Sequence, residues 1–285
     1  MTVASGAHYV AGRVRIDRET RNALPMTVLC VLPARIGSQR IPHKPLQRIA
    51  GRSLVEWSWM AASGVPGIDR VVIATDSEEI VTAAADFGAE VCLTSTRHES
   101  GTDRVAEVAL GEWGRGAAVV VNFQADEPFL PAAAVRAAVD AVKAGADVAT
   151  LACPIENEEE WMSPAVVKVA MAANGRALYF SRAAIPHPRD LAPQFGNATG
   201  PWLRHIGLYV YSSEALERWV KLPVSPLEAV ERLEQLRALE GGIGIHVCVV
   251  DAPEGGVDVP EDLERAERIL SKGNDHMHGI QEAHV

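Results

Sequence analysis

The sequence has few cysteines, and their spacing suggests neither a disulfide framework nor a zinc site. Its 285 residues include four cysteines, none of them in a C-x-x-C pair. Each lies in or beside an apolar, strand-like run, namely Cys30, Cys92, Cys153 and Cys248. Buried thiols of this kind are typical of a reducing compartment, so we expect free cysteines in a cytoplasmic protein.

Long hydrophobic runs are also missing. No apolar run approaches the roughly 18 residues that a transmembrane helix needs, so we expect no membrane insertion. Residues 1–25 are mixed in character, carry several arginines and lack the apolar segment of a secretory signal. We predict that they form a flexible extension ahead of the first strand.

An excess of positive charge is absent as well. The chain carries 27 Lys and Arg against 37 Asp and Glu, a net charge of −10. A surface this acidic repels nucleic acid and anionic membranes, so we expect neither as a partner. Any phosphate that the protein handles must be met locally, by a basic loop or a metal ion.

Apolar runs alternate with amphipathic stretches through residues 26–154. This alternation predicts an α/β fold with a doubly wound, mostly parallel sheet, in which ligands bind beyond the carboxyl ends of the strands. The expected strands are Thr27–Leu32, Arg70–Ala74, Glu90–Leu93, Ala118–Phe123 and Ala146–Cys153. The expected helices are Ser53–Ser63, Ser77–Phe87, Thr102–Trp113 and Pro131–Ala144.

The rhythm changes after Pro154, and we predict that residues 155–240 form a smaller second lobe. Its expected strands, which lack full crossover helices, are Val166–Met171, Ala177–Phe180 and Leu203–Tyr211. A helix is expected at Pro226–Glu240, with Ser225 and Glu228 as its capping box. Residues 241–270 should return to the main sheet with a strand, Gly244–Val250, and a helix, Pro260–Leu270, before a flexible tail at 271–285.

The first strand runs into a basic loop that matches neither common phosphate-binding motif. The loop has no G-x-x-x-x-G-K-[ST] and no G-x-G-x-x-G, which disfavours P-loop kinases and NAD-dependent dehydrogenases. It does place Arg35, Arg40 and Lys44 close together. Three cations at the end of a parallel strand indicate a polyphosphate cradle, although a solvated basic loop is the alternative.

Two acidic residues are candidates for a magnesium site. Asp126 follows the apolar run VVVNF, where a carboxylate can face the basic loop, but a plain turn also fits. Asp258 precedes Val259 and Pro260, the expected start of the last helix. Since valine is a poor cap, Asp258 is available to bind a ligand, although a solvated turn aspartate fits equally well.

Further polar residues stand at strand ends and helix starts. Thr75 and Asp76 end the second strand, and Ser100 and Gly101 precede a helix, where they suit a phosphate or base as well as a plain cap.

In the second lobe, Arg182, His205 and Tyr209 lie in apolar sequence surroundings. They could bind the carboxylate and hydroxyls of a ligand; the alternative is an ordinary half-buried cluster with no ligand. Glu231 and Gln235 share a helix face, for which surface decoration is the default interpretation.

Taken in order, these motifs resemble those of the 3-deoxy-manno-octulosonate cytidylyltransferases, also called CMP-Kdo synthetases. The resemblance covers residues 26–270 and rests on PAR-x-x-S-x-R-x-P-x-K-P-L, ATD, H-x-SGTDR, Q-x-DEP, ALYFSR, LRHIGLYVY, SPLE…LEQLR and GVD-x-PEDLE. It implies a Rossmann-like nucleotidyltransferase that transfers CMP from CTP to the anomeric hydroxyl of 3-deoxy-D-manno-octulosonate (Kdo), releasing pyrophosphate. It also implies a role in lipopolysaccharide biosynthesis and a homodimer formed through the second lobe.

The resemblance assigns roles residue by residue. It implies catalytic roles for Arg35, Lys44 and Asp126, and a Mg²⁺ ion bound by Asp126 and Asp258. It implies nucleotide binding by Ala34, Arg35, Ser38, Arg40, Lys44, Thr75, Asp76, Ser100 and Gly101. It implies sugar binding by Gln124, Arg182, His205, Tyr209, Glu231 and Gln235.

Departures from the family pattern occur at His43, Ala125 and Val259, where the family commonly has Gly, Gly and Thr. They leave open CMP activation of a related acid, such as amino-Kdo, a sialic acid or a phosphonate. A non-catalytic nucleotide-binding protein of the same fold would need neither Asp258 nor the second-lobe set.

Overall fold

The computed structural model of the chain describes residues 27–37, 40–190 and 192–281. The extension predicted at residues 1–25 and the predicted site residue Ser38 lie outside the described residues. Within the described ranges, no helix has the length and apolar character needed to span a membrane.

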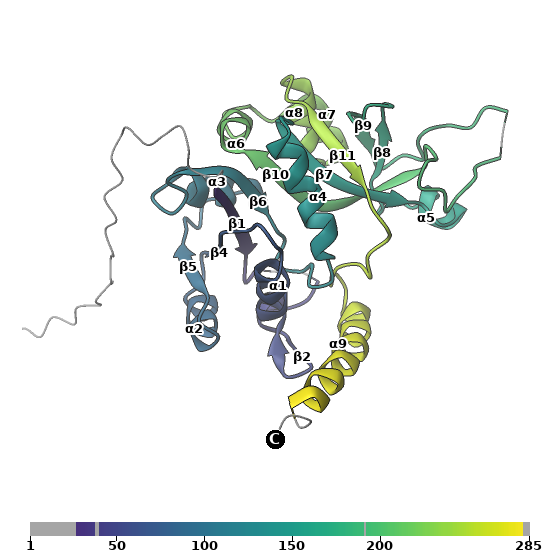
Figure 1. The fold of residues 1–285 in the computed structure, drawn as a ribbon. Helices are drawn as coiled ribbons and strands as arrows, with labels where there is room; N and C mark the ends of the chain where they lie inside the picture. Colours follow the sequence, from purple (N-terminus) through teal and green to yellow (C-terminus); the bar gives the residue numbers. More distant parts are fainter. Residues whose placement is uncertain (1–26, 38–39, 191, 282–285) are drawn as a thin grey trace, which may run out of the picture.

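The core of the molecule is a nine-stranded sheet in the order β11-β7-β10-β6-β1-β4-β5, with β8 and β9 attached beside β10 (Figure 1). Strand β1 pairs in parallel with β4 and β6, whereas β10 runs antiparallel to both β6 and β7. The mostly parallel, doubly wound sheet predicted from the sequence is therefore confirmed. The strands are β1 (Thr27–Ala34), β4 (Arg70–Thr75), β5 (Glu90–Leu93), β6 (Ala117–Asn122), β7 (Val148–Pro154), β8 (Lys168–Met171), β9 (Ala177–Ser181), β10 (Leu203–Ser212) and β11 (Ile245–Val249).

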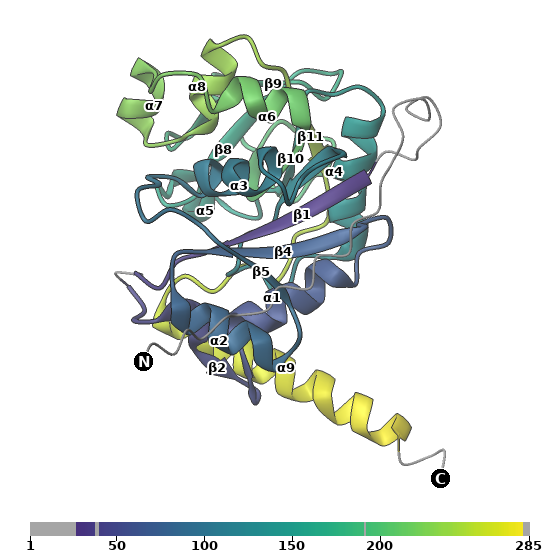
Figure 2. The same cartoon turned by 90° about the vertical axis from the view of Figure 1, so that its left-hand side faces the viewer.

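Both faces of the sheet are apolar because helices cover both. In β1, Val28, Cys30 and Leu32 pack toward α1, α2 and α4, while Leu29 and Val31 pack toward α3 and α6. Figure 2 shows α1 and α2 below the edge of β1 and β4, and α3 above it. The helices are α1 (Leu54–Ser63), α2 (Glu78–Asp86), α3 (Gly101–Leu110), α4 (Ala132–Lys143), α5 (Glu158–Met162), α6 (Ser213–Trp219), α7 (Pro226–Glu231), α8 (Gln235–Glu240) and α9 (Pro260–Gln281).

The four cysteines are free; Cys30 and Cys153 are buried, and Cys92 and Cys248 are partly buried. A short 3₁₀ helix (Lys44–Leu46) and a two-stranded hairpin, β2 (Arg48–Ile49) with β3 (Arg52–Ser53), connect β1 to α1. The sequence patterns did not predict these small elements, nor α5 and α6.

The two parts of the chain meet at β10. This strand belongs to the predicted second lobe, yet it lies in the main sheet between β6 and β7. It therefore carries residues of the second lobe to the strand whose end holds Asp126. The β8–β9 hairpin and helices α7 and α8 extend from this side of the sheet (Figure 1).

The single helix predicted at Pro226–Glu240 is wrong, because the structure divides it into α7 and α8. The capping box of Ser225 and Glu228 is confirmed, but the helix ends at Arg232, whose φ of 56° is left-handed. The resulting turn lets Leu233 and Leu236 enter the core shared with α6. Burial of these leucines offsets the cost of a non-glycine residue in the left-handed region, about 1–2 kcal/mol.

The last helix is longer than predicted. It begins at Pro260, as expected, but continues to Gln281 instead of ending at Leu270, into the segment predicted to be a flexible tail. No proline follows Pro260, and glycines lower helix propensity by about 1 kcal/mol each without breaking a helix. Ala266 of α9 and the preceding Val257 pack with Ile41, Ile49 and Leu54.

Candidate active site

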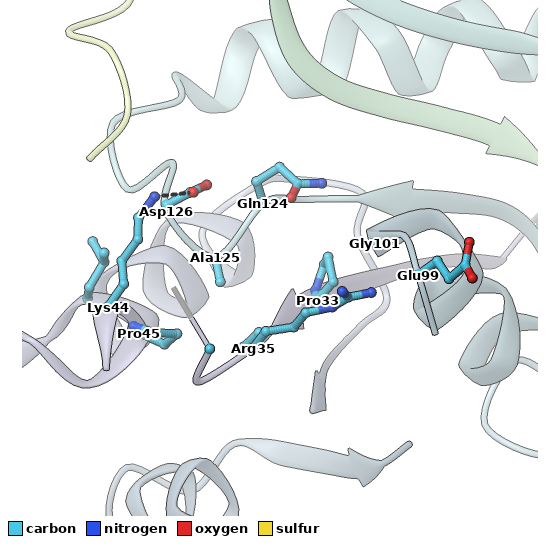
Figure 3. A pocket seen from close by; sticks show the side chains of 12 residues that line it. Pro33, Arg35, Lys44, Pro45, Glu99, Gly101, Gln124, Ala125 and Asp126 are labelled. Carbon is cyan, nitrogen blue, oxygen red and sulfur yellow. Dashed lines mark hydrogen bonds and ion pairs between the residues drawn. The ribbon is translucent and has the colours of Figure 1, made fainter. Parts of the chain in front are cut away.

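The basic loop after β1 and the acidic turn after β6 lie side by side, because the two strands are parallel neighbours and their carboxyl ends meet at one edge of the sheet. A pocket of about 320 Å³ opens between them (Figure 3). It is lined by Pro33, Ala34, Arg35, Gly37, Lys44, Pro45, Leu54, Glu99, Gly101, Gln124, Ala125 and Asp126.

At one end of the pocket, Lys44 joins the two predicted magnesium ligands. Its Nζ lies 2.6 Å from Asp126 Oδ2 and 2.9 Å from Asp258 Oδ1. The Lys44 side chain is 12% exposed, so this ion pair is shielded from water. Burial alone lowers the pKa of Lys44, but Asp126 and Asp258 outweigh it and raise the pKa above its ordinary value. Arg40 Nη2 stands 3.8 Å from Asp258 on the outer side.

The close packing of residues 256–258 on the Asp126 turn brings Asp258 to this place. The Val257 N–H donates to the Asp126 carbonyl oxygen at 2.9 Å, and Val257 is fully buried. Gly256 fits here because it has no side chain, since a Cβ would lie 2.9 Å from Glu127 Oε1. Asp262 accepts hydrogen bonds from the N–H groups of Asp258 and Val259, which fixes the start of α9 despite the valine cap.

The donor set fits a magnesium ion that also binds substrate phosphates. Among the described residues, no group of three or more His, Cys, Asp or Glu side chains is arranged to hold a metal. Asp126 and Asp258 nevertheless converge on one cationic point, the Lys44 ammonium. Magnesium prefers one or two carboxylates with phosphate and water ligands, so two protein oxygens are sufficient for such a site.

Glu127 is a charged residue of this region that the sequence analysis passed over. Burial raises its pKa, the negative charges of Asp126 and Asp258 raise it further, and the result is about 7. The carboxyl therefore carries a proton for part of the time near neutral pH. Its place directly after Asp126 was the only signal in the sequence.

Arg35 lies at the other end of the pocket and points toward Glu99 and Gly101 (Figure 3). Its Nη2 donates to the carbonyl oxygens of His98 and Ser100, at 2.7 and 2.9 Å. Ser100 in turn forms a capping box with Asp103 at the start of α3. The structure thus uses Arg35 and Ser100 to shape this wall of the pocket, and their contact with a nucleotide stays a prediction.

Thr75 and Asp76 have partners within the protein. The Thr75 hydroxyl accepts from the Ser77 N–H, and Asp76 Oδ2 lies 2.7 Å from the fully buried Arg104. Neither residue lines the pocket described above. Their predicted contact with the nucleotide is untested, and both support the loop between β4 and α2.

The predicted sugar-binding residues form two contacting groups. Glu231 accepts from the Arg182 N–H at 2.9 Å, and Arg182 Nε donates to the Glu231 carbonyl oxygen at 2.9 Å. The rings of His205 and Tyr209 lie 5.4 Å apart between centroids, as their shared strand face predicts. Burial lowers the pKa of His205 to about 4, so the ring is neutral at pH 7.

Among the described residues, no hydrogen bond joins the remaining two members to either group. Gln235 is 5% exposed at the start of α8. Gln124 lines the pocket and donates to Asn122 at the end of β6.

Comparison with known proteins shows the family of the chain. The profile of the cytidylyltransferase family matches residues 29–245. A 3-deoxy-manno-octulosonate cytidylyltransferase of Pseudomonas syringae pv. tomato is 48% identical over 246 residues, which cover 84% of this chain and 96% of the relative. One of Vibrio parahaemolyticus is 44% identical over 250 residues, which cover 87% and 99%. The chain belongs to the 3-deoxy-manno-octulosonate cytidylyltransferase family.

Solved structures agree with the family assignment. A CMP:2-keto-3-deoxy-manno-octonic acid synthetase, solved in complex with CTP, matches with a TM-score of 0.79 at 35% identity, covering 87% of this chain and 99% of the other. A 4-diphosphocytidyl-2C-methyl-D-erythritol synthase from Anaerococcus prevotii matches with a TM-score of 0.54 at 12% identity, which shows a common fold.

The departures from the family pattern have local structural consequences. His43 has a φ of 49°, a left-handed conformation that glycine adopts freely and other residues adopt at a cost. Ala125 is nearly buried, and its carbonyl oxygen accepts from the Ser58 hydroxyl at 2.8 Å, which ties the acidic turn to α1. Neither departure removes a residue that lies at the Lys44 site.

Glu234 is a second residue that the sequence analysis missed. It accepts from the hydroxyls of Ser100 and Thr102, at 3.2 and 3.0 Å, and so joins the α7–α8 turn to the start of α3. Burial raises its pKa, although these hydrogen bonds oppose the shift. The sequence analysis considered only the i,i+4 pair of Glu231 and Gln235 on a single helix, so it did not select Glu234. The left-handed Arg232 turns it toward α3.

Proposed function

We propose that this member of the family transfers CMP from CTP to the anomeric hydroxyl of Kdo, with release of pyrophosphate, and so supplies lipopolysaccharide biosynthesis. The observation that carries the proposal is the meeting of Lys44, Asp126 and Asp258 at the mouth of a pocket that begins at β1. The family relatives and the CTP complex of a related synthetase support the choice of nucleotide and sugar acid.

In this proposal, different parts of the site bind the nucleotide, the leaving pyrophosphate and the acceptor. The pocket between Arg35 and Gln124 is the space for the nucleotide, and Lys44 lies where charge develops as pyrophosphate leaves. A fixed ammonium stabilises that charge without reorganising in the transition state. Arg182, His205 and Tyr209, on the side of β9 and β10, bind the acceptor.

Asp126 and Asp258 would hold a Mg²⁺ ion together with the phosphates of CTP. Bound magnesium would neutralise charge on the triphosphate and lower the pKa of the attacking hydroxyl. Lys44 forms an ion pair with both carboxylates and keeps them close together.

The deciding experiment measures pyrophosphate release from each of the common nucleoside triphosphates, with Kdo, amino-Kdo and a sialic acid as acceptors. We expect rapid release only with CTP and Kdo, and CMP-Kdo as the product. Release with another acceptor alone would replace Kdo in the proposal, and release with no acceptor would contradict it.

The same assay tests the metal. We expect no turnover in excess EDTA and recovery with Mg²⁺. Asp126→Asn should fold but lose about 100-fold or more in kcat, since a metal ion contributes several kcal/mol to the transition state. Asp140→Asn, on the exposed side of α4, is the matched control and should leave the rate unchanged.

We also propose that the chain forms a homodimer through α7 and β9. Among the described residues, several large apolar side chains of this region stay exposed: Leu178, Val224, Leu227 and Val230. Exposed apolar patches mark interaction surfaces, and a second copy of the chain would cover this one. Sedimentation should show a dimer for the wild type and a monomer for Val230→Asp; monomeric wild type would contradict the proposal.

A further inference from the structure

Lys168, in β8, is a buried cation for which the proposed function has so far given no role. Its side chain is fully buried, which is rare for lysine without a carboxylate partner. The ammonium donates to three backbone carbonyl oxygens, those of Ser163 (2.8 Å), Val166 (2.7 Å) and Arg182 (2.7 Å). The ammonium has three N–H donors and each is bound to a carbonyl oxygen, so its hydrogen-bonding capacity is used in full.

The three carbonyls belong to two different segments of the second lobe. Ser163 and Val166 are in the loop between α5 and β8, and Arg182 directly follows β9. Lys168 therefore joins this loop to the residue that the proposed function places on the acceptor. An apolar side chain here would leave three buried carbonyls without a partner, at a cost for each.

The same loop holds the Arg182 side chain. Arg182 Nη1 donates to the Pro164 carbonyl oxygen at 2.9 Å, and its Nε donates to Glu231. Within the described part of the chain, Arg182 Nη2 has no hydrogen-bond partner. The guanidinium is thus anchored at two nitrogens, with the third left for a ligand.

His205 is attached to this loop as well. Its backbone N–H donates to the Val167 carbonyl oxygen at 2.8 Å, one residue before Lys168. Residues 163–168 therefore hold both Arg182 and His205. Burial lowers the pKa of Lys168 and the charge of Arg182 lowers it further, although Glu231 opposes both. The positive charges of Lys168 and Arg182 therefore lie near each other, and the carboxylate of Glu231 is near both.

We propose that Lys168 is a positioning residue for the acceptor: it binds the carbonyl of Arg182 and those of Ser163 and Val166, in the loop that also holds the Arg182 guanidinium through Pro164, and so fixes that guanidinium where it meets the carboxylate of the sugar acid. The inference rests on the proposed function, because it assumes a carboxylate acceptor on this side of the sheet. Lys168 itself touches no substrate. Its positive charge behind Arg182 adds to the attraction for an anionic acceptor.

The test compares Lys168→Met with wild type in steady-state kinetics. We expect KM for Kdo to rise about 10- to 100-fold, the range for losing hydrogen bonds to a charged group, with kcat and the KM for CTP nearly unchanged. Lys168→Gln, which keeps two N–H donors but no charge, should fall between the two. Lys143→Met, at the exposed end of α4, is the control and should match wild type.

A double variant distinguishes positioning from simple structural support. If Lys168 acts through Arg182, adding Lys168→Met to Arg182→Lys should raise KM for Kdo by much less than it does alone, because residues that share one interaction are non-additive. A fully additive effect, or equal rises of KM for Kdo and CTP, would overturn the proposal. The proposal would also be overturned if Lys168→Met lowered the Tm but left the KM for Kdo unchanged.

One measurement needs no variant and decides the matter if Lys168→Met does not fold. In hydrogen exchange of the wild-type chain, Kdo alone should slow exchange in residues 163–168 and 181–183, and CTP alone should not. Absence of that protection overturns the inference. Failure of the proposed function is distinguishable from failure of this inference, because in the first case the wild-type protein would form no CMP-Kdo.

Discussion

Lys44 has one role in the structure, as the cation between two acids, and a second role in the proposed reaction. Its ammonium neutralises Asp126 and Asp258, which would otherwise repel each other across a partly buried site. In the proposed reaction, a bound Mg²⁺ ion would give both carboxylates another cation, and the ammonium would be free to meet phosphate oxygens of CTP. Its sequence position in the basic loop indicated only the second role.

Lys44→Ala should therefore reduce turnover more than binding. We expect kcat to fall about 100-fold, roughly 3 kcal/mol, with a small change in the KM for CTP, because the charge on the leaving group grows in the transition state. Separate measurement of kcat and of KM for CTP tests this, with Lys221→Ala, in the exposed turn after α6, as the control. A raised KM with an unchanged kcat would indicate uniform binding instead.

His205 makes stability depend on pH. Burial lowers its pKa from 6.5 to about 4, and unfolding restores the ordinary value. Between these values the unfolded chain binds a proton that the folded chain does not, so this contribution is complete above about pH 6.5 and is lost as pH falls toward 4. The loss amounts to at most about 3 kcal/mol, at about 1.4 kcal/mol per pKa unit.

Urea unfolding at pH 7, 5.5 and 4.5 measures this effect as a falling midpoint. The variant His205→Gln, which has no titrating ring, should lose less stability over the same range. Equal losses in both proteins would mean that His205 keeps an ordinary pKa in the folded state.

The strands were the most predictable elements, and the helix ends the least. Strands such as β1 and β6 are covered on both faces, so their residues are apolar almost without interruption. Such runs are easy to recognise in the sequence. The break at Arg232 has no such mark, because it follows from where Leu233 and Leu236 find space in the core. Local propensity predicted a single helix, and tertiary packing divided it.

The start of α9 offers an element-level prediction. Asp262 already accepts from the Val259 N–H, which is half of a capping box, and a hydroxyl at position 259 would complete it. Val259→Thr keeps the shape of the side chain and should stabilise the protein by about 1 kcal/mol. Thermal unfolding measures the change, and KM for CTP should stay the same; a lower Tm would mean that the valine is held by packing.

At the scale of the whole molecule, the site depends on segments that are distant in the chain. Lys44 lies 82 residues from Asp126 and 214 from Asp258. The central sheet brings the first two together, because β1 and β6 are neighbours. The third arrives only because residues 256–257 pack on the turn after β6.

Gly256→Ala tests that packing. A Cβ would lie 2.9 Å from Glu127 Oε1 and the Asp126 carbonyl oxygen would lie 3.0 Å away, so the segment must move outward and take Asp258 with it. We expect kcat to fall about 10- to 100-fold, with more magnesium needed for half-maximal rate, as a small misplacement of a binding group can cost this much. Gly244→Ala, where a Cβ has open space, is the control. Unchanged magnesium dependence would show that Asp258 is not a ligand.

The sequence by itself determined the α/β class, the positions of the main strands and the chemistry available at their ends, because these follow from local apolar patterns and from residue type. Ordered motifs along the chain likewise carried the family. Only the tertiary structure decided that Lys44 binds both acids, that Glu127 is partly buried beside them, that Glu234 bonds to Ser100 and Thr102, and that Lys168 bonds to the Arg182 carbonyl. Those facts depend on contacts between distant segments and on burial, which a linear pattern does not encode.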